Sequence, residues 1–265
     1  MGFDENFAAL VCHPLAAKVD MVGHLTAYRP RYAWTRRAIE SYLPKPTGRV
    51  LDVGCGYGVT LALLKDDGFT ELLGIDLFTR QEDTFLAGVP NARIIPADLE
   101  TAAALADVAD ESCNCVISSQ VMEHLFNHPF GHLRECARVL HPGGVLLLDI
   151  PNPLTLANAW RMLSGRFDTW GDADFATLPK IGPDGRAATT WSIHYREYPP
   201  HVLRRLVDDL PGCRVLAAGY VGTAPRADDA VMKAWGKRLV RALGLRDTRL
   251  FGNVQWLVVQ KDPTP

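Results

Sequence analysis

One short stretch of this sequence combines an acid with three glycines at alternate positions: Asp52, Gly54, Gly56 and Gly58. Apolar residues before it predict a buried strand over 49–53, and leucines after it predict a helix over 59–66. Glycines let the backbone turn tightly and approach a ligand closely, because no Cβ is in the way. The start of the following helix offers unpaired N–H groups to a polar ligand. The stretch therefore predicts a cofactor site at the end of a strand.

The spacing of the glycines distinguishes between cofactors. A dinucleotide fingerprint requires Gly-x-Gly-x-x-Gly, and here the third glycine comes one residue early. Asp52 would repel a pyrophosphate, but it suits a ligand that carries positive charge, such as an ammonium or a sulfonium. Both features argue against a nicotinamide-dependent dehydrogenase.

The stretch resembles the first motif of class I S-adenosylmethionine (SAM) dependent methyltransferases, (Asp/Glu)-x-Gly-x-Gly-x-Gly, position for position. A second match follows the strand predicted over 114–118, where the segment Ser119 to Leu125 ends in Glu-His-Leu, as a signature of that family does. The resemblance is strong over 49–150 and weaker over 190–260. It implies SAM as the cofactor and methyl transfer as the reaction.

Two further acids are expected to hold the adenosine part of the cofactor. Asp76 ends the strand predicted over 71–75, where an acid in a doubly wound sheet accepts both ribose hydroxyls. Asp98 follows the strand predicted over 91–95, and the resemblance implies contact with the adenine amino group. It could instead cap a helix predicted over 99–107. The predicted cofactor-binding residues are Asp52, Gly54, Cys55, Gly56, Tyr57, Gly58, Asp76, Leu77, Asp98, Leu99 and Gln120.

The predicted elements follow one another as strand and helix five times, up to a strand over 145–150 preceded by a helix over 129–140. Such an order predicts a parallel sheet with right-handed crossovers. A helix over 201–210 and strands over 213–220 and 253–260 complete the core that the resemblance requires. We expect an α/β, doubly wound, Rossmann-like fold with a seven-stranded, mostly parallel sheet, an antiparallel last strand and helical inserts.

The chain outside this core divides into three parts. Residues 1–48 are expected to form an N-terminal helical lid over the cofactor pocket. The alternative is an amphipathic helix packed on the sheet with its arginines in solvent. Residues 49–265 form the expected methyltransferase domain, with inserts at 151–198 and 223–252. The role of a basic helix around 233–241 is left open, and a solvated face is favoured.

The acceptor side of the site is expected to carry a base and a polar wall. A hydroxyl acceptor benefits from a base that titrates near neutral pH, which points to histidine. His124 follows the fourth strand and His194 lies in an aromatic, charged run, and structural roles remain open for both. The residues expected to contact the substrate are Trp191, Tyr195, Arg196, Tyr198 and Tyr28. Asp149 and Asn152 are too few hard oxygen ligands for a magnesium or calcium site, so no metal is predicted.

The composition limits the classes of partner that we expect and the cell compartment of the protein. The 265 residues carry a formal net charge of −2, which gives no reason to expect nucleic acid as a partner. Six cysteines show no Cys-x-x-Cys pair, and no leader or membrane span is recognisable in the sequence. We therefore expect a cytoplasmic protein with a small-molecule or sugar acceptor, and a homodimer is left open.

The sequence favours methyl transfer from SAM to an oxygen of a small molecule or a sugar-containing metabolite. Two alternatives stay open. One keeps SAM but moves the methyl group to nitrogen or carbon, and the other is a methyltransferase-like subunit that serves as a partner without catalysis. The acceptor itself is not encoded in any recognisable motif.

Overall fold

The computed structural model describes residues 2–43, 45–77, 81–101, 104–127, 129–165, 180–181, 187–188, 194–223 and 243–263. The helices are α1 (Phe3–Val11), α2 (Pro14–Lys18), α3 (Val22–Tyr42), α4 (Val59–Leu64), α5 (Pro129–Val139), α6 (Leu156–Leu163) and α8 (Pro200–Asp208). The strands are β1 (Arg49–Val53), β2 (Glu71–Asp76), β3 (Ala92–Pro96), β4 (Cys113–Ser119), β5 (Leu140–Pro151), β6 (Lys180–Ile181), β7 (Ala187–Ala188), β8 (Cys213–Val221) and β9 (Val254–Lys261). Short 3-10 helices are η1 (Gln81–Asp83), η2 (Met122–His124) and η3 (Leu245–Asp247).

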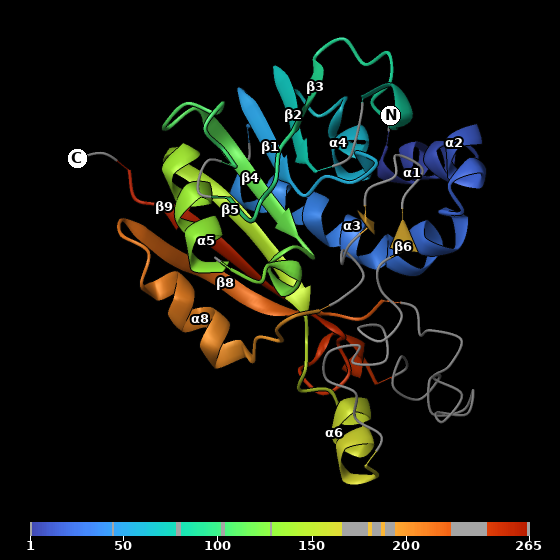
Figure 1. Cartoon of the computed structure of the whole chain (residues 1–265), viewed down its shortest axis with the longest axis vertical. Coiled ribbons are helices and arrows are strands. Elements are labelled where there is room, and N and C mark those ends of the chain that lie inside the picture. The colour runs from blue at the N-terminus through green and yellow to red at the C-terminus, as the bar shows by residue number, and fades with distance from the viewer. Residues whose placement is uncertain are drawn as a thin grey trace.

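Seven strands form one twisted sheet in the order β3-β2-β1-β4-β5-β9-β8 (Figure 1). The first five of these pair in parallel, whereas β9 pairs antiparallel with both β5 and β8. The sheet is thus parallel except for its last strand in sequence, which confirms the expected doubly wound, Rossmann-like fold. Most boundaries differ from the predicted ones by one or two residues, and the largest difference among the strands is that β5 begins at Leu140 and not at residue 145.

Helices cover both faces of the sheet, as the buried strands require. Neighbouring residues of β1 point to opposite faces: Val50 packs with α1 to α4, and Leu51 packs with α5 and α8. Both side chains are fully buried. The two apolar layers hold the carboxyl ends of β1, β2 and β4 at one edge of the sheet, and ligands bind at this edge in such folds.

The N-terminal helices belong to the same core as the sheet. Trp34 of α3 stacks on Trp256 of β9 with 5.0 Å between ring centroids. Arg36 of α3 pairs with Asp67 just after α4, with 2.8 Å between nitrogen and oxygen. Helix α3 therefore packs with the sheet, and its Arg31 is only 7% exposed and does not lie in solvent. That residues 1–48 act as a lid stays a prediction.

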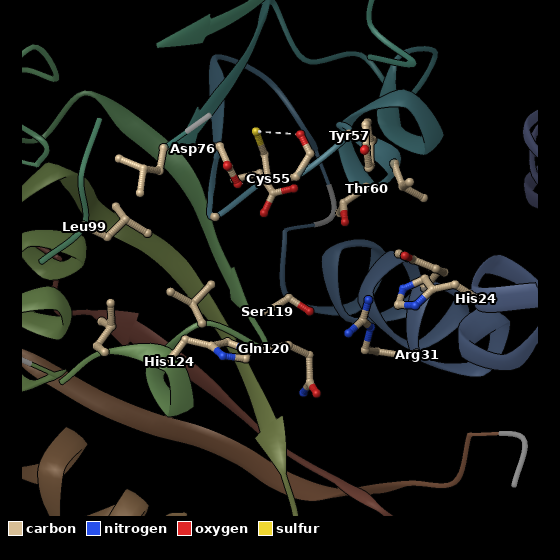
Figure 2. Close-up of a pocket in the computed structure, with 18 of the residues that line it drawn as sticks. His24, Arg31, Cys55, Tyr57, Thr60, Asp76, Leu99, Ser119, Gln120 and His124 are labelled. Carbon is tan, nitrogen blue, oxygen red and sulfur yellow. Dashed lines mark hydrogen bonds between the residues drawn. The ribbon is translucent and has the colours of Figure 1, made fainter. Parts of the chain in front are cut away.

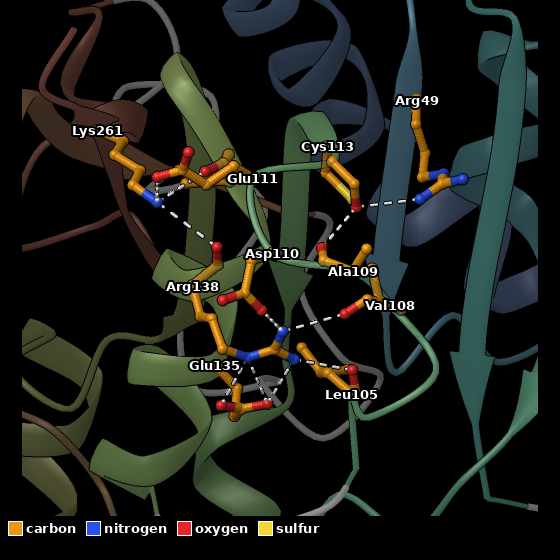
Figure 3. Close-up of polar contacts among 12 residues, drawn as sticks. Arg49, Leu105, Val108, Ala109, Asp110, Glu111, Cys113, Glu135, Arg138 and Lys261 are labelled. Carbon is orange, nitrogen blue, oxygen red and sulfur yellow. Dashed lines mark hydrogen bonds and ion pairs between the residues drawn. The ribbon is translucent and has the colours of Figure 1, made fainter. Parts of the chain in front are cut away.

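The helix predicted over 99–107 is absent from the described part of that range, which forms turns. Arg138 of α5 holds these turns by hydrogen bonds (Figure 3). Its guanidinium donates to the backbone carbonyls of Leu105 and Val108, at 2.8 and 3.1 Å, and also binds the carboxylates of Glu135 and Asp110. Carbonyls that a helix would pair within itself are satisfied here by an arginine from another helix.

None of the helices in the described part of the chain combines the length and apolar composition that crossing a membrane requires.

Candidate cofactor and acceptor site

The glycine turn after β1 has a backbone that side chains could not tolerate. Gly54, Gly56 and Gly58 have φ of 76°, 51° and 73°, in the left-handed region that favours glycine. A Cβ on Gly54 would lie 2.5 Å from Val121, and one on Gly58 would lie 2.8 Å from Leu86. At Gly56 a Cβ would meet nothing within 4 Å, because this residue faces open space. The turn is thus tightly packed behind and open on its ligand side.

The turn is tied to the end of β2. The backbone N–H groups of Gly54 and Cys55 both donate to the carbonyl of Ile75, at 2.7 and 3.0 Å. The carboxylate of Asp76 accepts from the N–H of Gly56 at 2.8 Å. These contacts place the Asp76 carboxylate beside the glycines, where the sequence expected it to hold a ribose.

A cavity of about 430 Å³ opens in front of this turn, within the range of small-molecule sites. It lies between the carboxyl ends of β1, β2 and β4 and helix α3 (Figure 2). The predicted cofactor-binding residues that line it are Asp52, Gly54, Cys55, Gly56, Tyr57, Asp76, Leu77, Asp98, Leu99 and Gln120. Gly58 does not line it and instead precedes α4 as its N-cap.

Asp98 makes a local hydrogen bond of the capping type and lies at the cavity edge, and its contact with adenine stays a prediction. Its side chain accepts from the N–H of Glu100 at 2.9 Å, which closes a turn of the kind that caps a helix. The residue also lines the cavity, next to Leu99. The described residues that follow form turns, so the local hydrogen bond serves to fix the orientation of Asp98 at the cavity edge.

Helix α3 supplies a wall of the cavity that the sequence pattern did not reveal. Met21, His24, Arg31 and Tyr32 all line the cavity, and Figure 2 shows His24 and Arg31 across it from Leu99. Burial, with help from the Arg31 charge, lowers the pKa of His24 to about 4. The wall is cationic at Arg31 and neutral at His24. The sequence signal for this wall is the stretch of arginines interleaved with aromatic residues. That pattern does not indicate which arginine points into the cavity.

Tyr28 supports this wall from behind and does not line the cavity. Its ring stacks on His24 at 4.4 Å and lies 4.9 Å from the guanidinium of Arg31. The ring of Tyr32 lies at the same distance from Arg31. Cation–π contacts of this kind hold a buried arginine in one orientation. Tyr28 was expected to contact the substrate, and the structure places it one layer further out.

Two buried carboxyl groups lie within the electrostatic reach of Arg31. Burial raises the pKa of Asp52 to about 8, and the Arg31 charge opposes that rise. Burial likewise raises the pKa of Asp149, again against Arg31 and the hydrogen bonds from Ser119 and Gln120. Of these groups Arg31 and Asp52 line the cavity, so the cavity offers a cation to a carboxylate and a carboxyl group to an ammonium, as a zwitterionic amino acid group requires.

The turn after β4 is fixed by Asp149 of β5. The Asp149 carboxylate accepts from the Ser119 hydroxyl at 2.6 Å and from the Gln120 amide at 2.9 Å. Gln120 has φ of 57°, rare for a residue with a side chain, so these bonds must hold a strained backbone. The turn directs Val121 and His124 into the cavity.

His124 and His194 lie together at one corner of this cavity. Their rings meet edge to face at 4.9 Å between centroids. His124 lines the cavity, whereas His194 packs behind it. The two are joined because the N–H of Tyr195 donates to the carbonyl of Glu123 at 2.8 Å, and the Tyr195 ring lies against Phe126. The predicted pair is thus brought together from segments 70 residues apart.

The other expected substrate residues that the structure describes, Tyr195, Arg196 and Tyr198, do not line the cavity. Arg196 and Tyr198 line a different pocket of about 550 Å³ between α5 and α8. Tyr198 is 2% exposed and belongs to the apolar core. The cause is the packing of α8, which draws the preceding residues towards the α5 face. Trp191 and the basic stretch 233–241 lie outside the described residues, so their predicted roles stay predictions.

The residues at the cavity fit a SAM molecule by their chemistry. The open side of Gly56 leaves room for a ligand against the backbone, and Asp76 and Asp98 present acceptors to a nucleoside. Arg31 presents a charge that complements a carboxylate, and the carboxyl oxygens of Asp52 can accept hydrogen bonds from an ammonium. Each part of the cofactor therefore has a chemically suited partner.

A family model described as a methyltransferase domain matches residues 51–148, from β1 to β5. Over this range the chain belongs to the class I SAM-dependent methyltransferase superfamily. The cofactor of this domain is S-adenosylmethionine. The matched range includes the glycine turn, Asp76 and the turn after β4.

The names of the curated relatives specify methylation of different atoms, oxygen in one and carbon in another. The chain is 33% identical to a ubiquinone biosynthesis O-methyltransferase of Paracidovorax citrulli over 43% of its own length and 48% of the relative's. It is 27% identical to the ubiquinone/menaquinone biosynthesis C-methyltransferase of Photorhabdus laumondii over 67% and 69% of the two chains. The first curated relatives are matched over only 40% to 48% of their own length.

A similar solved structure comes from a complex between the Haloferax volcanii Trm112 methyltransferase activator and a methyltransferase. That chain superposes with a TM-score of 0.58 at 16% identity, over 100% of this chain and 99% of its own. At this identity the likeness supports the methyltransferase fold and nothing finer.

Proposed function

We propose that this chain transfers the sulfonium methyl group of SAM to an oxygen of a small molecule or a sugar-containing metabolite. The observation that carries the proposal is the pair of imidazoles at the edge of the cofactor cavity, His124 and His194. A hydroxyl is a poor nucleophile until its proton is removed, and histidine is the side chain best suited to accept one near neutral pH. The O-methyltransferase among the relatives supports the same choice.

SAM supplies an activated methyl group on a positive sulfur. The chain therefore has to bind the cofactor and the acceptor, orient them and exclude water. Asp76 holds the ribose diol, and Asp98 accepts from the adenine amino group. Arg31 binds the carboxylate of the methionine part, and Asp52 faces its ammonium. These four contacts leave the sulfonium to face the turn after β4.

The acceptor then enters on the side of Val121 and His124. His124 lines the cavity and is 23% exposed, so its ring reaches both the acceptor and solvent. His194 backs it, and the Glu197 carboxylate lies 3.3 Å from His194 Nδ1 and orients that ring. In this arrangement His124 would take the proton from the acceptor hydroxyl as the oxygen–methyl bond forms and the sulfur–methyl bond breaks, with S-adenosylhomocysteine as the leaving group. His194 holds the His124 ring in place.

A panel of hydroxylated metabolites with labelled SAM tests the proposal. We expect label in an alkali-stable ether of at least one acceptor, and His124→Ala should lower turnover roughly 10²–10⁴-fold while SAM affinity stays near wild type. His201→Ala, on the exposed side of α8, is the matched control and should keep full turnover. Label found on carbon or nitrogen of the product would contradict the assignment to oxygen.

A further inference from the structure

Glu123 carries a carboxyl group that is buried close to the cofactor cavity. It lies in η2, between the turn after β4 and the segment that leads to α8, and it is 1% exposed. Neither of its side-chain oxygens has a hydrogen-bond partner among the described residues. Burying a carboxyl group in this way costs free energy unless something compensates for it. The proposed methyl transfer does not use Glu123, so its placement calls for another explanation.

Two imidazoles lie beside this carboxyl group. His124 Nε2 is 4.0 Å from Glu123 Oε1, and one nitrogen of His194 completes a group of three ligand atoms that all lie within 4.8 Å of one another. The backbone bond from Tyr195 to the Glu123 carbonyl fixes the two segments at this separation. In the described part of the chain this is the group of His, Cys, Asp and Glu side chains with the geometry to hold a metal ion.

The surroundings of His194 match those of metal-bound histidines. Its Nδ1 lies 3.3 Å from the carboxylate of Glu197, so Nε2 is the nitrogen that remains to serve as a metal ligand. A metal-ligating histidine commonly donates its other ring N–H to a carboxylate, which fixes the tautomer and the ring orientation. This contact is independent of the burial of Glu123, and both observations point to the same centre.

The ligand set favours transition ions over magnesium or calcium. Two imidazole nitrogens and one carboxylate oxygen form a set typical of catalytic zinc and of related divalent ions, whereas Mg²⁺ and Ca²⁺ prefer oxygen ligands alone. Ligand atoms about 2.1 Å from a tetrahedral ion are separated by about 3.4 Å, so modest side-chain rotations close the observed group onto an ion. Such a set leaves one position open.

We propose that Glu123, His124 and His194 bind one divalent transition-metal ion, Zn²⁺ first, with its open position facing the cofactor cavity. His124 lines that cavity, so a ligand on the open position lies on the acceptor side. Here the inference rests on the proposed function: an acceptor hydroxyl bound to the ion loses its proton to solvent more readily. With the ion bound, both imidazoles are ligands, and the ion takes over the activation assigned above to His124.

Cobalt is the probe for this site, because Co²⁺ replaces Zn²⁺ and has visible absorption that reports its coordination. Untagged protein is stripped with a chelator and titrated with Co²⁺, then with Zn²⁺ in competition. We expect one Co²⁺ per chain with an intense tetrahedral-type spectrum, displaced by one equivalent of Zn²⁺ and not by millimolar Mg²⁺. No spectrum, or displacement by Mg²⁺, would overturn the proposal.

Matched variants locate the ion. Glu123→Gln and His194→Gln should each weaken Co²⁺ binding at least 100-fold, and Glu197→Gln should weaken it roughly 10- to 100-fold. His201→Gln, an exposed histidine of α8, should bind as the wild type does. His194 is 30% exposed, so its variant stays informative even where Glu123→Gln fails to fold. Wild-type affinity in the His194→Gln variant would overturn the site.

These measurements need neither SAM nor an acceptor, so a failure of the site and a failure of the proposed function remain distinguishable. With an acceptor found, methyl transfer should fall at least tenfold after stripping and return with Zn²⁺. Full transfer by the stripped protein would overturn the role of the open position.

Discussion

The carboxylate of Asp76 accepts a hydrogen bond of 2.8 Å from the backbone N–H of Gly56. This bond joins the end of β2 to the middle glycine of the turn after β1, and both residues line the cofactor cavity. It holds the acid that is proposed to bind the ribose at a fixed place relative to the glycine backbone.

Replacing Asp76 with Asn should weaken SAM binding by about tenfold to a hundredfold. A charge-assisted hydrogen bond to each ribose hydroxyl contributes roughly 1.5–3 kcal/mol, and an amide offers only one acceptor oxygen without charge. Calorimetric titration measures the affinity, with Asp208→Asn on the exposed face of α8 as the control. Unchanged SAM affinity in Asp76→Asn would refute the ribose assignment.

Arg31→Met should discriminate between ligands that do and do not carry the amino acid part of SAM. We expect about tenfold to hundredfold weaker binding of S-adenosylhomocysteine, because its carboxylate loses a charged partner. Binding of 5′-methylthioadenosine, which has no carboxylate, should change little. Isothermal titration of both ligands provides the comparison, and equal losses would show that Arg31 acts only through the fold.

SAM and S-adenosylhomocysteine should raise the melting temperature, whereas NAD and NADP should not. A ligand that binds only the native state stabilises it by about 2.7 kcal/mol at a concentration of one hundred times Kd. For a chain of this length that corresponds to roughly 5–10 °C. A thermal-shift assay at matched ligand concentrations is sufficient. A larger shift with NAD than with SAM would overturn the cofactor.

The buried His132 should make the protein less stable in acid. Burial lowers the pKa of His132 to about 4, and its Nε2 lies 2.9 Å from the Ser118 hydroxyl. The unfolded chain binds a proton near pH 6.5 and the folded chain does not, so stability is full above pH 6.5 and is lost as pH falls towards 4. The loss amounts to roughly 3 kcal/mol at pH 4. Urea unfolding between pH 7 and 4 measures it.

His132→Gln is the control for that measurement, because a glutamine cannot gain a proton. Its unfolding free energy should fall less steeply with acid than that of the wild type, by roughly the same 3 kcal/mol. Parallel pH dependences of the two proteins would contradict the assignment to His132.

The sequence by itself determined the sheet and the cofactor edge. Alternating strand and helix patterns, with a glycine turn after the first strand, are local signals. The carboxyl ends of parallel strands must meet at one edge, so the order of the elements, together with the family resemblance, predicted Asp52, Asp76, Asp98 and Gln120 in one cavity. The helix predicted over 99–107 was wrong because the local signal was ambiguous. The turns found there are held by Arg138, and no residue near 99–107 in the sequence indicates that contact.

Only the tertiary structure decided which side chains complete the site. Arg31 turns inward because aromatic rings hold it beside two buried carboxyl groups, while Arg36 on the same helix pairs outward with Asp67. Tyr198 is drawn into the core by α8, although Tyr195, three residues earlier, is bonded to Glu123. The contact of His124 with His194, and the burial of Glu123 between them, depend on segments 70 residues apart. Such pairings arise from packing, and no local pattern in the sequence records them.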